Sequence, residues 1–238
     1  MAERTTRRRP GRPKDEVLTA QRREAILEMA TRVFAERGYR HTDVEAVAAA
    51  AGVGKGTVYR HFPDKRALFL SAVDQGMQGL QTCVDGAAPD CSGSLEDLRA
   101  AMEAGIRAHL TFFDKHPEVV ELLIQERAEF KDRRQPTYVA YAHRNKARWK
   151  PLVEALRAQG RLRDLPHDEM HEFMTQIIYG TMFVNYFRGR RRSIAAQVRR
   201  IVDVVLFGVL TDAERHRLAP PAAPGPTPQG THSQHGRP

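Results

Sequence analysis

The spacing of the apolar residues limits what this chain can fold into more than any other feature. Apolar positions recur three or four residues apart, which places them on one stripe of an α-helix. The segment 19–37 is an example, with its stripe formed by Ile26, Met29, Ala30, Val33 and Phe34. Similar patterns cover about 95–113, 118–130, 136–159, 167–187 and 193–211. Because no stretch alternates as a strand does, the sequence predicts an all-α protein.

Two short helices are expected between residues 42 and 62, after the longer helix of 19–37. Gly38 can end the long helix in a left-handed conformation. Thr42-Asp43-Val44-Glu45 has the spacing of a capping box, with Thr42 as the N-cap. Gly52 closes the first short helix, Val53-Gly54 connects it to the second at 55–62, and Pro63 ends that one. This order predicts a helix-turn-helix unit over 19–64, stabilised by the longer helix.

The second short helix begins with residue types that suit DNA. Lys55, Gly56 and Thr57 offer a cation, an approachable backbone and a hydroxyl to the major groove. Tyr59 and His61 can reach phosphate oxygens, although Tyr59 would alternatively be partly buried in the core. The candidate DNA-binding residues of this unit are Thr42, Gly54, Lys55, Gly56, Thr57, Tyr59, Arg60, His61 and Lys65.

The same segment resembles the DNA-binding signature of the TetR family. The resemblance covers about residues 20–70 and is carried by Gly38-Tyr39, Thr42, Val44, the run from Ala51 to Phe62, Lys65 and Leu68. It implies a homodimeric, ligand-responsive regulator, usually a repressor, with a helical C-terminal domain. Carried over by position, Thr42, Tyr59, His61 and Lys65 would hold phosphates, and Lys55, Gly56 and Thr57 would lie nearest the bases.

The chain departs from this signature at Gly54, where the family commonly has a serine that caps the recognition helix. Glycine is a slightly weaker N-cap, and the phosphate contact of the serine hydroxyl is lost.

Basic residues concentrate at the N-terminus of a chain whose formal net charge is +9. Residues 1–24 hold eight Lys or Arg against four acidic residues. We expect 1–18 to form a disordered basic arm, in which Arg8-Arg9-Pro10-Gly11-Arg12-Pro13 resembles an AT-hook. Arg9 and Arg12 would then enter a narrow minor groove, where the negative potential is concentrated. A tail that binds phosphates without sequence preference is the simpler and slightly favoured alternative.

Residues 65–213 are expected to form a helical effector-binding and dimerisation domain, with a loop over about 79–93. The last two helices are apolar over most of their circumference, which suggests burial on more than one side. In the family that the chain resembles, these helices pair across a two-fold axis as a four-helix bundle. The expected dimer interface is Phe173, Ile177, Val198, Val202, Val205 and Val209.

Aromatic residues gather in the same domain and predict a pocket for an apolar or aromatic effector. The alternative is that most of them fill the core. The candidate pocket residues are His109, Phe112, Phe113, Tyr138, Tyr141, Trp149, Tyr179 and Phe183.

The remaining patterns point away from catalysis. Pairs such as His167 and His171 lack a supporting metal motif, and no activated nucleophile or phosphate loop is present, so we expect no metal, no cofactor and no enzyme. Cys83 and Cys91 are expected to be loop thiols, and a redox switch formed by the two is the less favoured alternative. No signal peptide or membrane span is evident, so a cytoplasmic protein is expected. The Pro-rich segment 214–238 is expected to be a disordered tail.

Together these patterns predict a homodimeric repressor that is released from a palindromic operator by a small molecule. Two alternatives stay open: an activator of the same family, and an architectural protein that coats DNA with its basic arm.

Overall fold

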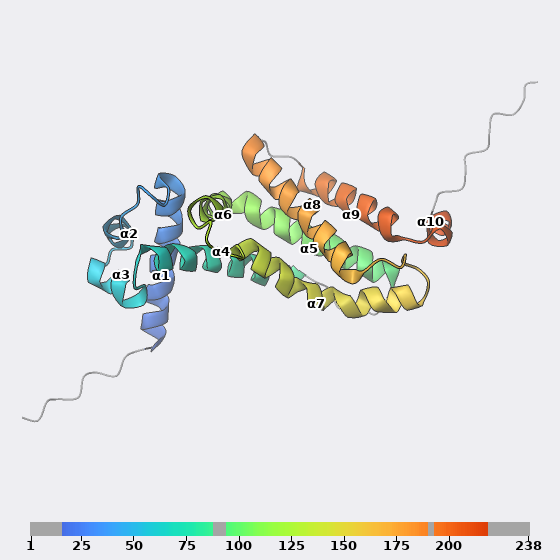
Figure 1. Ribbon diagram of the computed structural model, residues 1–238, viewed down its shortest axis with the longest axis horizontal. Helices are drawn as coiled ribbons and strands as arrows, with labels where there is room; N and C mark the ends of the chain where they lie inside the picture. Colours follow the sequence, from blue (N-terminus) through green and yellow to red (C-terminus); the bar gives the residue numbers. More distant parts are fainter. Residues whose placement is uncertain (1–15, 88–93, 190–192, 219–238) are drawn as a thin grey trace, which may run out of the picture.

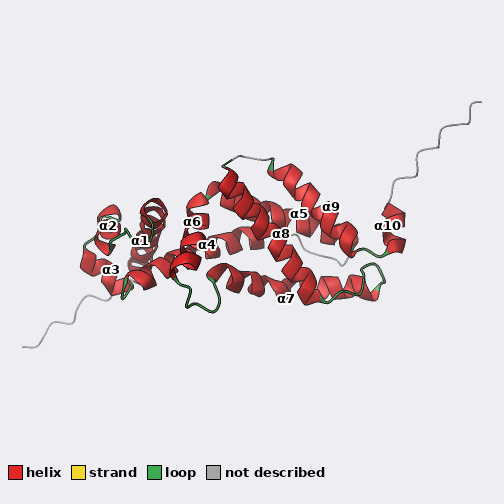
Figure 2. Cartoon of the chain, turned by 45° about the horizontal axis from the view of Figure 1, so that its top comes forward, coloured by secondary structure: helices red, strands yellow, loops and turns green. Residues whose placement is uncertain are grey.

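The computed structural model describes residues 16–87, 94–189 and 193–218, and these residues form an elongated all-α protein (Figures 1 and 2). Apart from an isolated bridge between Leu162 and Leu210, the described part of the chain contains no β-structure. Its helices are α1 (Glu16–Arg37), α2 (Val44–Ala50), α3 (Lys55–His61), α4 (Lys65–Ala87), α5 (Leu95–Lys115), α6 (Pro117–Glu129), α7 (Thr137–Ala158), α8 (His167–Arg188), α9 (Ile194–Val209) and α10 (Asp212–Leu218). None of them is long and apolar enough to cross a membrane.

Helices α1, α2 and α3 form the helix-turn-helix unit at one end of the molecule (Figure 1). The two glycines that were expected to end helices both adopt the left-handed conformation, with φ of +80° at Gly38 and +63° at Gly52. The buried side chains of Val47 and Val58 hold α2 and α3 in the core formed with α1.

The capping box expected at Thr42 is wrong. Helix α2 has Asp43 as its N-cap, without a side-chain hydrogen bond. The Thr42 side chain is fully buried, and its hydroxyl donates to the carbonyl oxygen of Gly38 at 2.8 Å. The turn after α1 folds back on the helix and encloses Thr42, so this residue fixes the turn instead of capping α2.

Helix α4 is longer than expected and includes much of the predicted loop at 79–93. Two glycines of α4 lie where other helices come close: a Cβ at Gly76 would be 2.8 Å from Val119, and one at Gly79 would be 3.3 Å from Phe112. Glycine here permits close helix packing and does not end the helix. Cys83 is therefore exposed on a helix, and Cys91 lies outside the described residues.

A continuous aromatic cluster joins the helix-turn-helix unit to the rest of the molecule. The ring of Phe69 on α4 lies 5.0 Å from that of Phe34 on α1 and 5.5 Å from that of Phe130, which follows α6. Tyr39 packs on Phe130 at 4.9 Å. The boundary expected at residue 64 therefore separates two segments of the chain that share one core.

The C-terminal half begins with a side-chain cap and ends with a short helix that was not expected. Ser94 and Asp97 form a reciprocal capping box at the start of α5. The disordered tail expected over 214–238 is wrong for residues 214–218, because residues 212–218 form α10. Its Glu214 is buried and pairs with Arg161 at 2.8 Å, so burial of this ion pair holds the short helix on the domain. Residues 219–238 lie outside the described residues.

Candidate functional site

Helix α3 presents most of its predicted DNA-binding residues to solvent. Lys55, Gly56 and Arg60 are exposed, and Tyr59 has 44% of its surface accessible. The opposite face of α3 carries Val58, which is completely buried. Thr57 and His61 lie half-buried between the two faces. The exposure of Tyr59 disfavours the alternative that its ring belongs to the core.

The N-terminal turn of α3 is open to close approach. Gly54 is the N-cap and makes no side-chain hydrogen bond, and its carbonyl oxygen accepts from the Thr57 amide at 2.8 Å. A Cβ at Gly54 or at Gly56 would meet nothing within 4 Å. The Lys55 ammonium lies 3.5 Å from the Glu45 carboxylate, in an exposed ion pair that screening weakens. A polyanion could therefore reach the backbone amides of this turn without displacing side chains.

Two of the expected phosphate contacts have other partners. Burial of Thr42 contradicts its predicted role, because a fully enclosed hydroxyl cannot touch a phosphate. The Lys65 ammonium donates to the Tyr39 carbonyl oxygen at 2.9 Å and lies 4.5 Å from the centroid of the Tyr39 ring. Lys65 thus stabilises the turn between α1 and α2, and its role at a phosphate stays a prediction.

The start of α1 adds positive charge beside α3. Burial lowers the pKa of His61, and the nearby guanidinium groups of Arg23, Arg60 and Arg22 lower it further. Arg23 also lies 5.2 Å from the centroid of the Phe62 ring. Arg22 and Arg23 are exposed, so α1 extends the basic surface beside α3. The predicted arm residues Arg9 and Arg12 lie outside the described residues.

A second feature is a cavity of about 170 Å³ in the C-terminal half, lined by residues of α4, α5, α7, α8 and α9. Four of the predicted pocket residues line it: His109, Tyr141, Trp149 and Tyr179. The other four do not. Phe112 and Phe113 pack on each other at 5.3 Å, and Tyr138 and Phe183 pack at 6.5 Å. Phe113 instead lines a separate cavity of about 270 Å³.

The sequence pattern missed part of the lining of the 170 Å³ cavity. Met102, Met170 and Met174 contribute flexible apolar surface, and His167 and His171 contribute polar atoms. The spacing of the two histidines was a usable signal, but it was weighed only as a metal motif. The described residues hold no group of three or more potential metal ligands.

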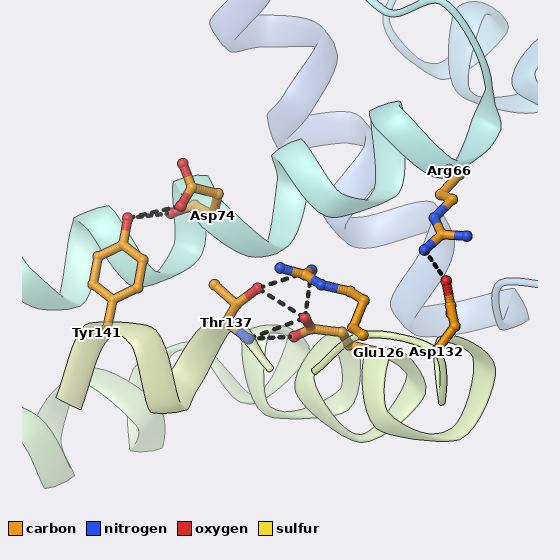
Figure 3. Close-up of polar contacts among 7 residues, drawn as sticks. Arg66, Asp74, Glu126, Asp132, Thr137 and Tyr141 are labelled. Atoms are coloured by element: carbon orange, nitrogen blue, oxygen red, sulfur yellow. Dashed lines mark hydrogen bonds and ion pairs between the residues drawn. The ribbon is translucent and has the colours of Figure 1, made fainter. Parts of the chain in front are cut away.

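The cavity is connected to α4, the helix that follows α3 after three residues. Tyr141 lines the cavity, and its hydroxyl donates to Oδ1 of Asp74 on α4 at 2.9 Å (Figure 3). Nearer to α3, Arg66 of α4 donates to Asp132 at 2.7 Å. Both partners of α4 belong to the segment from the end of α6 to α7 (Figure 3), so movement of this segment acts on α4 at two points.

The buried carboxylate of Glu126 organises the same segment. It accepts from Arg133 at 2.6 Å, from the Thr137 hydroxyl at 2.8 Å and from the Thr137 amide at 3.0 Å (Figure 3). A negative charge at this place also stabilises the N-terminus of α7. Glu126 therefore has a structural role.

The residues of the expected dimer interface differ in exposure within the single chain. Val198, Val202 and Val205 are buried within the chain's own core, where α9 packs on α5. Val209 lines the cavity, and Ile177 is half-buried. Of the predicted residues only Phe173 is largely exposed. The exposed apolar side chains of these two helices are Phe173, Val184 and Phe187 on α8 and Val204 and Phe207 on α9.

The chain is similar to known regulatory proteins. The family model described as bacterial regulatory proteins, tetR family, matches residues 26–72. The activator FasR of Mycolicibacterium smegmatis is 35% identical over 39% of this chain and 40% of its own length, and the repressor BepR of Brucella suis is 32% identical over 47% and 53%. The chain thus spans about half the length of these two relatives. The repressor KstR2 of Rhodococcus jostii is 26% identical over 79% of this chain and 91% of its own length.

Solved structures agree with the fold over most of the chain. The fatty acid degradation regulator FadR from Bacillus halodurans superposes with a TM-score of 0.67 at 16% identity, covering 79% of this chain and 95% of that one. KstR2 of Mycobacterium tuberculosis superposes with a TM-score of 0.55 at 22% identity, covering 80% and 96%. Residues 26–72 thus match the helix-turn-helix of the tetR family of bacterial regulatory proteins, and most of the chain shares its fold with these solved regulators.

Proposed function

We propose that this protein is a homodimeric transcriptional repressor that binds a palindromic operator and leaves it when a small molecule enters the 170 Å³ cavity. The exposed N-terminal turn of α3 carries this proposal. It combines the Lys55 cation, the bare backbone of Gly56 and the hydroxyl of Thr57 at the tip of a helix-turn-helix unit. Such a turn fits the major groove with its N-terminus first.

The dimer is proposed to form through the exposed apolar face of α8 and α9. Phe187 and Val204 have 68% and 60% of their surface accessible, and Phe173, Val184 and Phe207 continue the face. Large apolar side chains gathered on a surface favour a partner. A two-fold axis there would present two α3 helices to one side of a duplex, and half-sites one turn or more apart, roughly 35 Å, would make the operator palindromic.

The effector is proposed to act through α4. A molecule in the cavity contacts Tyr141, whose hydroxyl is bonded to Asp74 of α4. Since α4 follows α3 closely and shares the aromatic cluster with α1, a shift of α4 changes the position of α3. The ligand would thereby favour a dimer whose recognition helices no longer match the groove.

Selection of bound sequences from random duplex DNA at physiological salt tests the proposal. We expect a palindromic winner. Tyr59→Phe should weaken binding to all sequences about equally, because it removes a phosphate contact. Thr57→Ala should also change which sequences are preferred. Full affinity in both variants would refute the placement of α3 in the groove.

Two other functions give different outcomes in the same experiment. The net charge of +9 supports an architectural protein, which would bind tightly without selecting any sequence. An activator, as the relative FasR is named, would select a palindrome equally well. A reporter gene behind the selected site separates the last possibility, because deletion of an activator lowers expression and deletion of a repressor raises it.

A further inference from the structure

Among the side chains that the structure describes, those lining the 170 Å³ cavity include none with a permanent charge. The polar groups of this wall come from histidine, tyrosine, threonine and glutamine, and the remainder is aliphatic, aromatic or methionine. Two cations of α7 have other neighbours: Lys146 pairs with Asp168 at 2.6 Å, and the Arg144 guanidinium lies 4.5 Å from the centroid of the Tyr141 ring. An ionised ligand would therefore leave water without gaining a counter-charge, which is strongly unfavourable.

His167 has one ring nitrogen that is buried in this wall without a partner. Its Nε2 lies 3.0 Å from the carbonyl oxygen of Lys146. A carbonyl oxygen can only accept, so Nε2 is the donor of this hydrogen bond. In the neutral form of the ring this is the single ring proton, which makes Nδ1 an acceptor. Nδ1 is buried and has no hydrogen-bond partner. Because burying an unpaired acceptor costs free energy, this atom is suited to a ligand that donates a hydrogen bond.

His109 on α5 supplies a second ring nitrogen without a hydrogen-bond partner. Its side chain is 92% buried between the rings of Phe113 and Tyr179, and its Nε2 has no partner. Burial lowers the pKa of His109 to about 3, so the ring is neutral near pH 7. A neutral imidazole can pair with a hydroxyl but offers no charge to an anion.

We propose that the cavity binds an uncharged molecule with an apolar body of at least one ring and a hydroxyl group that donates to Nδ1 of His167, with His109 as a second polar contact. The inference rests on the proposed function only in taking this cavity as the effector site. An apolar cavity of about 150 Å³ holds benzene, so 170 Å³ accommodates a single substituted ring.

A set of three matched probes tests this ligand class. 4-Ethylphenol has the required donor, 4-ethyltoluene replaces the hydroxyl by a methyl group, and 4-ethylbenzoate replaces it by a carboxylate. Trp149 is the only tryptophan of the chain and lines the cavity, so quenching of its fluorescence reports occupancy. We expect saturable quenching by 4-ethylphenol, with a Kd at least about tenfold lower than for either analogue.

Variants assign the effect to the histidine. His167→Phe should raise the Kd of 4-ethylphenol about tenfold and leave that of 4-ethyltoluene nearly unchanged, because only the phenol uses the acceptor. His216→Phe on the exposed surface of α10 is the matched control and should change neither Kd. Helix content and thermal unfolding of both variants show whether each still folds. His109→Leu provides a second variant of the cavity if His167→Phe does not fold.

The outcomes that overturn the inference are distinct from those that overturn the proposed function. Tighter binding of 4-ethylbenzoate, equal binding of phenol and toluene, or no saturable quenching by 4-ethylphenol would each refute the ligand class. These titrations use the full chain without DNA, so they hold even if no operator is selected. Conversely, binding of 4-ethylphenol without release of a selected operator would refute effector-controlled repression by this class and leave the ligand chemistry intact.

Discussion

Removal of the Glu126 carboxylate should destabilise the joint between α6 and α7 strongly. The side chain is buried and accepts three hydrogen bonds, from Arg133, the Thr137 hydroxyl and the Thr137 amide. Truncation of one member of a buried ion pair typically costs about 3–5 kcal/mol. The Arg133 side chain is 29% exposed, so it can regain water, which places Glu126→Ala near the lower limit, at about 3 kcal/mol. Glu126→Gln keeps the volume and one acceptor, and should cost about 2 kcal/mol.

Urea unfolding followed by circular dichroism measures both losses of stability, with protein concentration held constant because the proposed dimer would contribute to apparent stability. Glu118→Gln on the same helix is the control. Its carboxylate is partly exposed and interacts with His116, so a loss within about 1 kcal/mol is expected. The reasoning is refuted if Glu126→Ala and Glu118→Gln lose the same amount. A changed slope of free energy against urea would indicate instead that the extent of unfolding had altered.

Three further predictions follow from single features of the structure. Gly52→Ala should lower the free energy of unfolding by about 1 kcal/mol, because φ is +63° at this position. Gly105→Ala inside α5 should raise it by up to about 1 kcal/mol. Thermal unfolding of the two variants distinguishes these opposite signs. Val204→Glu should raise the dimer dissociation constant at least about tenfold in sedimentation experiments, whereas the control Arg107→Glu should leave it unchanged. Unchanged dimerisation of Val204→Glu would exclude the proposed interface. His61 has a lowered pKa in the free protein, and a DNA phosphate beside it would raise that pKa. DNA binding should therefore take up a proton and become tighter as pH falls. If His61→Gln shows the same pH dependence of DNA binding, His61 does not contact a phosphate.

The sequence by itself determined the local architecture of this protein. The helical stripe through Ile26, Ala30 and Val33 and the left-handed glycines at positions 38 and 52 depend on neighbours within a few residues. The helix-turn-helix unit follows from the same local rules, so its position and the exposed Lys55 at the start of α3 could be predicted. The Ser94–Asp97 capping box was predictable for the same reason.

Tertiary structure decided which partner each apolar face meets. Val198 and Val202 were correctly interpreted as buried, but their stripe packs on α5 of the same chain and leaves Val204 and Phe207 exposed. From the local sequence alone, Gly76 and Gly79 could either end a helix or permit close helix packing. The closeness of Val119 and Phe112 in the structure shows that they permit packing. Thr42 was buried by the turn that encloses it. Periodicity shows that a residue is buried, whereas its neighbours are set by contacts between helices distant in the sequence.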